Sequence, residues 1–180
     1  MIMPLEEVWN YANAIPGWFT RTSVEELYGF ALTCEGTMVE VGVNQGRSAA
    51  VLLLAARHTG ARVVLVDSWA SVLIENMDKV KSRFTEEFPD VAWRIINLPS
   101  VEAAELVDGP LSLVHIDANH YDEHPSDDCA AWLPKLSSGG IACFHDYGST
   151  FEAVTPAVDK HTAGWGDLGV WDGLAIRRKP

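Results

Sequence analysis

The chain has few basic residues and few cysteines, and each shortage excludes a class of protein. Lysine and arginine number 13 against 25 aspartate and glutamate residues, giving a formal net charge of −12. Because nucleic acid and anionic membrane surfaces are bound through basic faces, neither is an expected partner. The three cysteines form no Cys-x-x-Cys pair, which argues against a disulfide framework or a zinc knuckle. A reducing compartment fits this composition, and we expect a cytoplasmic protein.

Long apolar runs are also lacking. The longest spans residues 49–56, far short of the ~20 residues that a membrane-spanning helix needs. The N-terminus turns acidic directly after Met1-Ile2-Met3-Pro4, unlike a signal peptide. With 48% hydrophobic and 21% charged residues, 180 residues suit one domain with a full core. We expect residues 1–36 to form a helical segment packed on a core domain over 37–180.

From residue 37 onward, apolar runs typical of strands alternate with amphipathic segments typical of helices. The expected strands are 37–43, 62–67, 91–98, 111–117 and 140–145, and the expected helices are 47–58, 74–88, 101–107, 125–136 and 151–162. This alternation is typical of a parallel sheet with helices on both faces. Near the end of the chain, Asp172-Gly173 is a standard two-residue hairpin turn. The sequence therefore predicts an α/β fold with a Rossmann-like, mostly parallel seven-stranded sheet and a C-terminal antiparallel hairpin.

A glycine turn joins the first strand to its helix. Gly42 and Gly46 bracket this turn, which exposes backbone N–H groups and a helix N-terminus that attract an anionic group. Asp67, at the end of the second strand, can accept hydrogen bonds from two ribose hydroxyls. Together they predict half of a nucleoside-binding unit. The Gly-x-Gly-x-x-Gly of a dinucleotide site is absent. Simple strand–helix packing for the glycines and a helix cap for Asp67 remain alternatives.

Further motifs follow in order: Val66-Asp67-Ser68-Trp69, Ile116-Asp117-Ala118-Asn119-His120 and Phe144-His145-Asp146-Tyr147. At these spacings, residues 15–180 resemble the class I S-adenosylmethionine-dependent methyltransferases, and most closely the branch around macrocin O-methyltransferase and the cephalosporin-hydroxylase-like sugar O-methyltransferases. The resemblance implies S-adenosylmethionine as cofactor and a small-molecule acceptor. Methyltransferases that act on nitrogen resemble one another through Asn/Asp-Pro-Pro-Tyr/Phe, which this chain lacks. Oxygen is therefore the expected methyl acceptor.

The resemblance also assigns a set of cofactor contacts. The expected residues are Glu40, Gly42, Gly46, Arg47, Ser48, Asp67, Trp69, Ser100 and Asp117. Glu40 would accept a bond from the cofactor's ammonium, Asp67 would bind the ribose, and Ser100 would hold the adenine edge. A core position for Trp69 and an N-cap role for Ser100 are equally open.

Polar segments follow the fourth and fifth strands, where ligands bind in open α/β sheets. Asp117, His145 and Asp146 are the candidate ligands of Mg²⁺ or another divalent cation. The catechol-type enzymes have an Asp-Asn pair at the second place, so His145-Asp146 departs from their pattern, and a role in orienting substrate stays open. Those enzymes carry a lysine base at the position of His120, so His120 is the candidate general base, beside Asp117. His115 is interpreted as a core histidine.

Two other functions compete with an enzyme of this kind. One is a catalytically silent module that binds a nucleoside or S-adenosylmethionine, suggested by the short segment before the first strand. The other is an NAD-linked oxidoreductase, which the missing dinucleotide motif disfavours. Three tryptophans, Trp9, Trp18 and Trp165, leave two roles open, a contact between copies of the chain in a homo-oligomer or a lid over the pocket.

Overall fold

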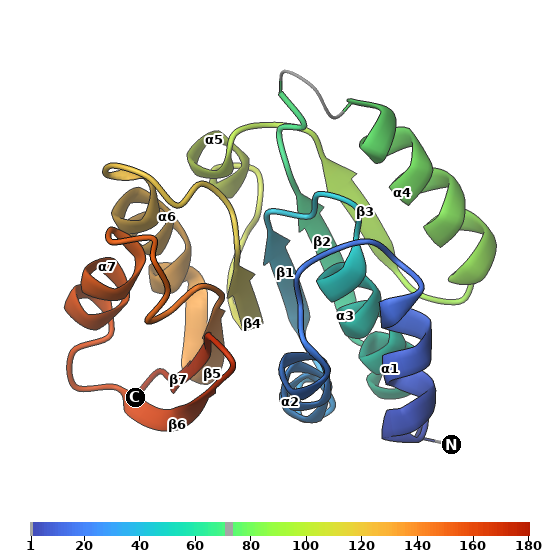
Figure 1. Ribbon diagram of the computed structural model, residues 1–180, viewed down its shortest axis with the longest axis horizontal. Helices are drawn as coiled ribbons and strands as arrows, with labels where there is room; N and C mark the ends of the chain where they lie inside the picture. Colours follow the sequence, from blue (N-terminus) through green and yellow to red (C-terminus); the bar gives the residue numbers. More distant parts are fainter. Residues whose placement is uncertain (1, 71–73) are drawn as a thin grey trace.

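The computed structural model describes residues 2–70 and 74–180, in which helices cover both faces of a seven-stranded sheet (Figure 1). The helices are α1 (Leu5–Asn13), α2 (Arg21–Ala31), α3 (Arg47–Thr59), α4 (Ile74–Glu87), α5 (Ser100–Ala104), α6 (His124–Trp132), the 3₁₀ helix η1 (Leu133–Lys135) and α7 (Val154–His161). The strands are β1 (Thr37–Val41), β2 (Arg62–Val66), β3 (Trp93–Ile96), β4 (Leu111–Ile116), β5 (Leu136–Phe144), β6 (Gly166–Trp171) and β7 (Leu174–Arg178).

The strands lie in the order β3-β2-β1-β4-β5-β7-β6. The first five run parallel to one another, whereas β7 is antiparallel to both β5 and β6. Asp172 and Gly173 turn the final hairpin with φ of 48° and 84°, the positive values that a type I′ turn requires. The predicted fold class is therefore confirmed. The strand order reverses between β1 and β4, which is where open α/β sheets bind ligands.

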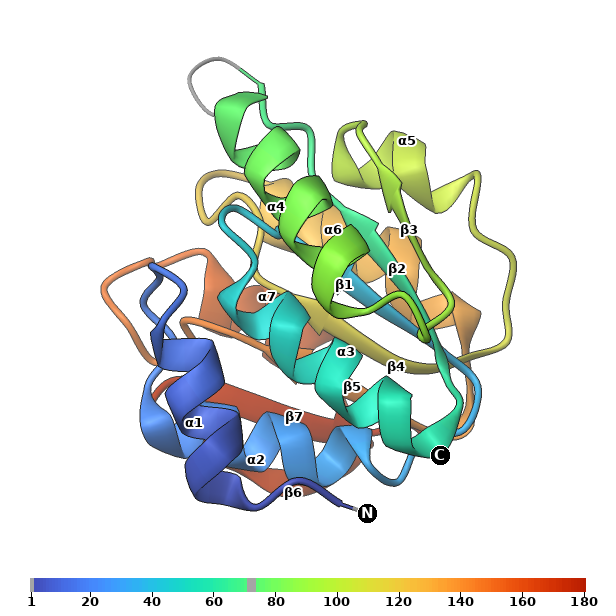
Figure 2. The same ribbon diagram turned by 90° about the vertical axis from the view of Figure 1, so that its right-hand side faces the viewer.

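Two cores flank the sheet. Helices α1 to α4 pack on one face, which Figure 2 shows toward the viewer, and α5 to α7 pack on the other. Helix α3 is buried from Ser48 to Ala56, because the sheet lies on one side of it and α1 and α2 on the other. The apolar run 49–56 is thus the middle of a core helix. None of the described helices is both long and apolar enough to cross a membrane.

The predicted boundary between the helix over 125–136 and the strand that follows it is wrong. The sequence pattern favours a helix over 125–136 and a strand over 140–145, but α6 ends at Trp132 and β5 already begins at Leu136. Pro134 lies in the intervening 3₁₀ turn, where its missing N–H and its ring prevent the α-helix from continuing. Leu136 then pairs with Leu111 of β4 across a register irregularity.

Candidate active site

The carboxyl ends of the parallel strands open into a pocket of about 1640 Å³. Its wall gathers segments that are distant in sequence, namely residues 42–48, 66–68, 99–102, 117–121 and 145–149. A pocket for one small ligand measures about 300–1,000 Å³, so this one has room for two ligands side by side. The prediction that the polar strand ends are spatial neighbours is confirmed.

The two glycines of the turn are required by a positive φ and by close packing against their neighbours. Gly42 has a φ of +91°, and a Cβ there would lie 1.9 Å from the carbonyl oxygen of Asp117 at the end of β4. Gly46 has a φ of +93° and precedes α3, and its Cβ would meet the ring of Phe84 at 2.9 Å. Both glycines also line the pocket. Packing therefore explains their identity, and their contact with a cofactor stays a prediction.

Asp67 holds the glycine turn in place. Its Oδ2 accepts hydrogen bonds from the backbone N–H groups of Val43 (2.9 Å) and Asn44 (2.8 Å), and its Oδ1 accepts one from Trp69 (2.8 Å). A carboxylate offers about four lone-pair sites, so three backbone donors occupy most of its capacity. Asp67 still lines the pocket, and its contact with a ribose stays a prediction.

Glu40 lies beneath the pocket instead of in its wall. Its carboxylate is fully buried, accepts a hydrogen bond from the Ser48 hydroxyl and contacts Nδ1 of His115 at 2.9 Å. His115 is also fully buried, as the interpretation of a core histidine requires. This trio ties β1, β4 and the first turn of α3 together. A direct bond from Glu40 to the cofactor's ammonium stays a prediction.

Arg47 fastens the loop between α1 and α2. Its guanidinium donates to the carbonyl oxygens of Ile15 (2.7 Å) and Phe19 (2.9 Å). The loop residue Trp18 is 81% exposed and lines the mouth of the same pocket. Arg47 itself lines the pocket, but two loop carbonyls engage its guanidinium.

Trp69 and Ser100 each had two open interpretations. Trp69 is only 3% exposed and donates its indole N–H to the carbonyl of Asn44, which places it in the core. The N-cap of α5 is Pro99, so Ser100 does not cap this helix. Ser100 lines the pocket and accepts a 2.9 Å hydrogen bond from the indole N–H of Trp132.

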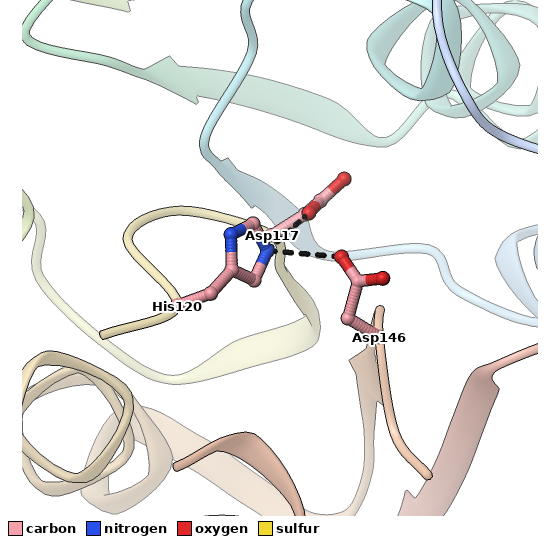
Figure 3. A group of neighbouring side chains, drawn as sticks. All are labelled: Asp117, His120 and Asp146. Carbon is pink, nitrogen blue, oxygen red and sulfur yellow. Dashed lines mark hydrogen bonds and ion pairs between the residues drawn. The ribbon is translucent and has the colours of Figure 1, made fainter. Parts of the chain in front are cut away.

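Two aspartates and two histidines meet beyond β4 and β5, and Figure 3 shows three of them converging. His120 Nε2 lies 3.1 Å from Asp117 Oδ1 and 3.0 Å from Asp146 Oδ2. His145 Nδ1 lies 3.4 Å and 3.0 Å from the same two oxygens. The ring of Phe151 stacks on His120 with centroids 4.6 Å apart, which fixes the imidazole plane. We call Asp117, His120, His145 and Asp146 the His–Asp cluster.

The cluster can offer ligand atoms to a divalent cation. Asp117, His120 and Asp146 each place one such atom within 4.8 Å of the others. The sequence named His145 as the third ligand, whereas this arrangement favours His120. Two carboxylates and an imidazole suit Mn²⁺ or a related cation, and this donor set fits such a metal. The same atoms also satisfy one another through ion pairs, so the cluster is complete without one.

The cluster keeps both histidines protonated at neutral pH. Hydrogen bonds to Asp117 and Asp146 raise the pKa of His120 to about 9. Burial opposes protonation of His145, but its bonds to the same carboxylates outweigh burial and raise its pKa to about 10. Burial alone would raise the pKa of each aspartate, yet the two histidines hold both values well below the usual range. His120 is therefore not the neutral base that a pKa near 6.5 would give.

These shifts predict a loss of stability at alkaline pH. Protonated histidines with raised pKa stabilise the fold fully below pH 6.5, and this contribution disappears as pH rises through 9 to 10. The lowered pKa of the aspartates adds stability above pH 3.8 that is lost on acidification. We expect the melting temperature of the wild type to fall more steeply between pH 7 and 10 than that of His120→Gln, measured by scanning fluorimetry. Parallel pH profiles would contradict the ion pairs.

The pocket contains two residues that the sequence did not single out. Asp128 of α6 is buried in its wall, and Phe151 stacks on His120. A signal for Asp128 was present, because it lies among apolar residues on the face of α6 that also carries Trp132. No pattern pointed to Phe151, because its contact depends on the path of the loop before α7.

Comparisons with known proteins identify a family for the part of the chain that forms most of this pocket. A family model described as "Methyltransferase domain" matches residues 39–147, which is more than half of the chain. No curated protein matches the sequence.

Several solved structures share the fold. The SAH-bound methyltransferase PaMTH1 of Podospora anserina is 18% identical, with a TM-score of 0.75 over 99% of this chain and 89% of that one. The O-methyltransferase NovP is 18% identical, with a TM-score of 0.71 over 97% and 88%. CalS11, a TDP-rhamnose 3′-O-methyltransferase, is 16% identical, with a TM-score of 0.67 over 99% and 87%. At such identities the likeness concerns the fold alone.

Proposed function

The chain belongs to the class I S-adenosylmethionine-dependent methyltransferases, since the methyltransferase-domain family covers residues 39–147, and we propose that it methylates a hydroxyl oxygen of a small molecule. One observation carries the proposal: the glycine turn, Asp67 and the His–Asp cluster line a single pocket. The names of NovP and CalS11 as O-methyltransferases support oxygen as the acceptor atom, and CalS11 supports the sugar O-methyltransferase branch.

The pocket residues fit the cofactor. Gly46, Arg47 and Ser48 bring the N-terminus of α3 into the wall, where its unpaired N–H groups and dipole attract a carboxylate. Seven aspartate and glutamate residues line the remainder, which suits a ligand that carries a sulfonium and an ammonium. Bound S-adenosylmethionine supplies an already activated methyl group, so the protein has mainly to align the acceptor oxygen with it.

The His–Asp cluster would receive the acceptor hydroxyl. While the imidazole of His120 is protonated, the hydroxyl donates its hydrogen bond to Asp117 or Asp146. Once the imidazole is neutral, the hydroxyl donates to His120 Nε2 instead, which takes its proton. Because the carboxylates favour the protonated form of His120, this base acts best at alkaline pH. A divalent cation held by Asp117, Asp146 and a neutral His120 would polarise the hydroxyl instead, and His120 would then be a ligand and not the base.

The wall of the pocket favours an acceptor without phosphate or carboxylate groups. Arg47 is the only lysine or arginine among the described lining residues, and its guanidinium is bonded to two loop carbonyls. Trp18, Tyr121 and Phe151 add aromatic surface, on which the flat face of a sugar or phenol ring can pack. Uncharged phenols, sugars and natural products therefore fit better than nucleotide-linked ones.

Calorimetry with S-adenosylhomocysteine tests the cofactor first. We expect a dissociation constant within the range of about 1 μM to 1 mM that enzyme ligands usually show. Turnover is then followed with uncharged phenols and sugars and with their phosphorylated counterparts, each with Mg²⁺, Mn²⁺ or EDTA. Methylation of the uncharged compounds alone would support the proposal. Binding without any turnover would favour the catalytically silent module, and absence of binding would defeat both.

A further inference from the structure

The loop between α1 and α2 carries one exposed aromatic ring and, directly after it, a buried one. Trp18 is 81% exposed, whereas Phe19 is only 4% exposed. The ring of Phe19 lies beside two imidazoles: its centroid is 5.3 Å from that of His115, with an angle of 76° between the planes, and 5.0 Å from that of His145, with an angle of 33°. The N-terminal segment thus places one ring against both a core histidine and the His–Asp cluster.

The plane of an imidazole has to be set by its neighbours, because the torsion that turns the ring has broad minima. Phe151 sets the plane of His120, since the two rings stack with an angle of 20° between them. Phe19 is the corresponding neighbour of His145. Each histidine of the cluster therefore has an aromatic ring beside it, one from the N-terminal part of the chain and one from the C-terminal part.

The orientation of His145 bears on the two carboxylates of the cluster. Its Nδ1 lies 3.4 Å from Asp117 Oδ1 and 3.0 Å from Asp146 Oδ2. His120 Nε2 contacts the same two oxygens. If the ring of His145 turned, both oxygens would lose a partner, and the carboxylates that receive the acceptor hydroxyl would be free to turn as well. A displacement of ~1 Å near the reacting atoms can cost a factor of ~100 in rate.

Arg47 fixes the backbone that carries Phe19. Its Nη1 donates to the carbonyl oxygen of Phe19 at 2.9 Å, and its Nε donates to that of Ile15 at 2.7 Å. The hydroxyl of the next residue, Thr20, donates to Asp172 in the hairpin turn at 3.0 Å. Contacts with α3 and with the turn between β6 and β7 therefore hold the loop at Phe19 and on either side of it.

We propose that Phe19 is a positioning residue for the methyl transfer. Its ring holds the imidazole of His145, and through it the two carboxylates of the His–Asp cluster, in the arrangement that receives the acceptor hydroxyl. Arg47 acts through Phe19 by holding its carbonyl, which gives this arginine a task at the acceptor end of the pocket. The inference rests on the proposed function and adds a segment before the first strand to the residues that serve it.

Nuclear magnetic resonance tests the positioning without an acceptor. At neutral pH the wild type should show the Nδ1–H proton of His145 as a slowly exchanging signal, because a carboxylate accepts its hydrogen bond. Phe19→Leu keeps a buried apolar side chain but lacks the flat ring, and the signal should be lost through exchange with water. Phe30→Leu is the control, since it removes the same kind of ring from α2, outside the pocket, and should keep the signal. Absence of the signal from the wild type, or its survival in Phe19→Leu, would overturn the inference.

Turnover supplies a second readout, with catechol and methyl glucoside as probe acceptors. Phe19→Leu should lower kcat at saturating S-adenosylmethionine by at least ~10-fold, within the ~100-fold that misplacement can cost. Its dissociation constant for S-adenosylhomocysteine should stay within ~3-fold of the wild-type value, because the ring packs on the histidines. A kcat within ~3-fold of the wild type would overturn the inference alone. If neither probe is methylated, the His145 signal decides. Absence of S-adenosylhomocysteine binding by the wild type would instead overturn the proposed function.

Arg47→Met tests whether the arginine acts through Phe19. This variant removes both bonds to the loop, and it should lose the His145 signal and kcat as Phe19→Leu does. The double variant should lose no more than the worse single variant, because both changes act on one ring. Multiplied losses would overturn the action of Arg47 through Phe19, and so would an intact His145 signal with weaker binding of S-adenosylhomocysteine, the result expected of a direct cofactor contact. If Phe19→Leu does not fold, Phe19→Met and Arg47→Met decide by the same measurements.

Discussion

Replacing Asp117 with alanine is expected to lower kcat/KM for methyl transfer by at least ~100-fold, the lower end of what positioned acid–base groups contribute. Asp117 Oδ1 contacts both His120 and His145, so its loss removes an acceptor for the substrate hydroxyl and loosens the candidate base together. Removing the carboxylate also lowers the pKa of His120, so the pH–rate profile should shift to lower pH as the residual activity falls. Steady-state kinetics between pH 6 and 10 measures both effects.

Two variants make this experiment specific. Asp117→Asn keeps the shape of the side chain but removes its charge, and it should lose activity to a similar degree. Asp78→Ala changes an exposed aspartate of α4 outside the pocket and should leave kcat/KM unchanged. An Asp117→Ala enzyme within ~3-fold of the wild type would remove the His–Asp cluster from the mechanism. A weaker affinity for S-adenosylhomocysteine with unchanged kcat would reduce Asp117 to a cofactor contact.

The fold and the place of the site could be predicted because they follow from local patterns. Alternating apolar and amphipathic segments predict a parallel sheet, and a parallel sheet gathers its carboxyl ends at one edge. Asp67, Asp117 and Asp146 each follow a strand, so their meeting in one pocket needs no further information. The helix predicted over 125–136 is present but ends early, at Trp132, because Pro134 outweighs the apolar periodicity around it.

The direction of individual side chains could not be predicted, because it depends on contacts between distant segments. Arg47 follows the glycine turn, yet its guanidinium reaches the carbonyls of Ile15 and Phe19 in another loop. Trp69 turns into the core through a bond to Asn44. His120 joins Asp117 and Asp146 only because the loop after β4 brings its imidazole to residues that follow β5. Sequence spacing places such residues near the site. Whether a side chain then lies in the pocket wall, in the core or in the His–Asp cluster is decided by the tertiary structure.

Glu40→Ala is expected to lower the free energy of unfolding by about 3–5 kcal/mol, the usual cost of breaking a buried pair by removing one partner. The variant leaves the Ser48 hydroxyl and the His115 imidazole buried without their shared acceptor. His115 Nε2 already has no hydrogen-bond partner among the described residues, so loss of Glu40 leaves the whole ring unsatisfied. Urea denaturation followed by circular dichroism measures the loss.

The physical cause is tested by removing the second partner as well. Glu40→Leu combined with His115→Leu replaces both polar groups with apolar ones, and this double variant should be more stable than Glu40→Ala, because neither buried residue then lacks a partner. Glu40→Gln can still accept from Ser48 and should lose less. If the free energy of unfolding of Glu40→Ala is within ~1 kcal/mol of the wild-type value, Glu40 has no structural role, and a direct contact with the cofactor is the better explanation of this residue. In that case the affinity of Glu40→Ala for S-adenosylhomocysteine should fall while its stability holds, so the two roles predict opposite pairs of measurements.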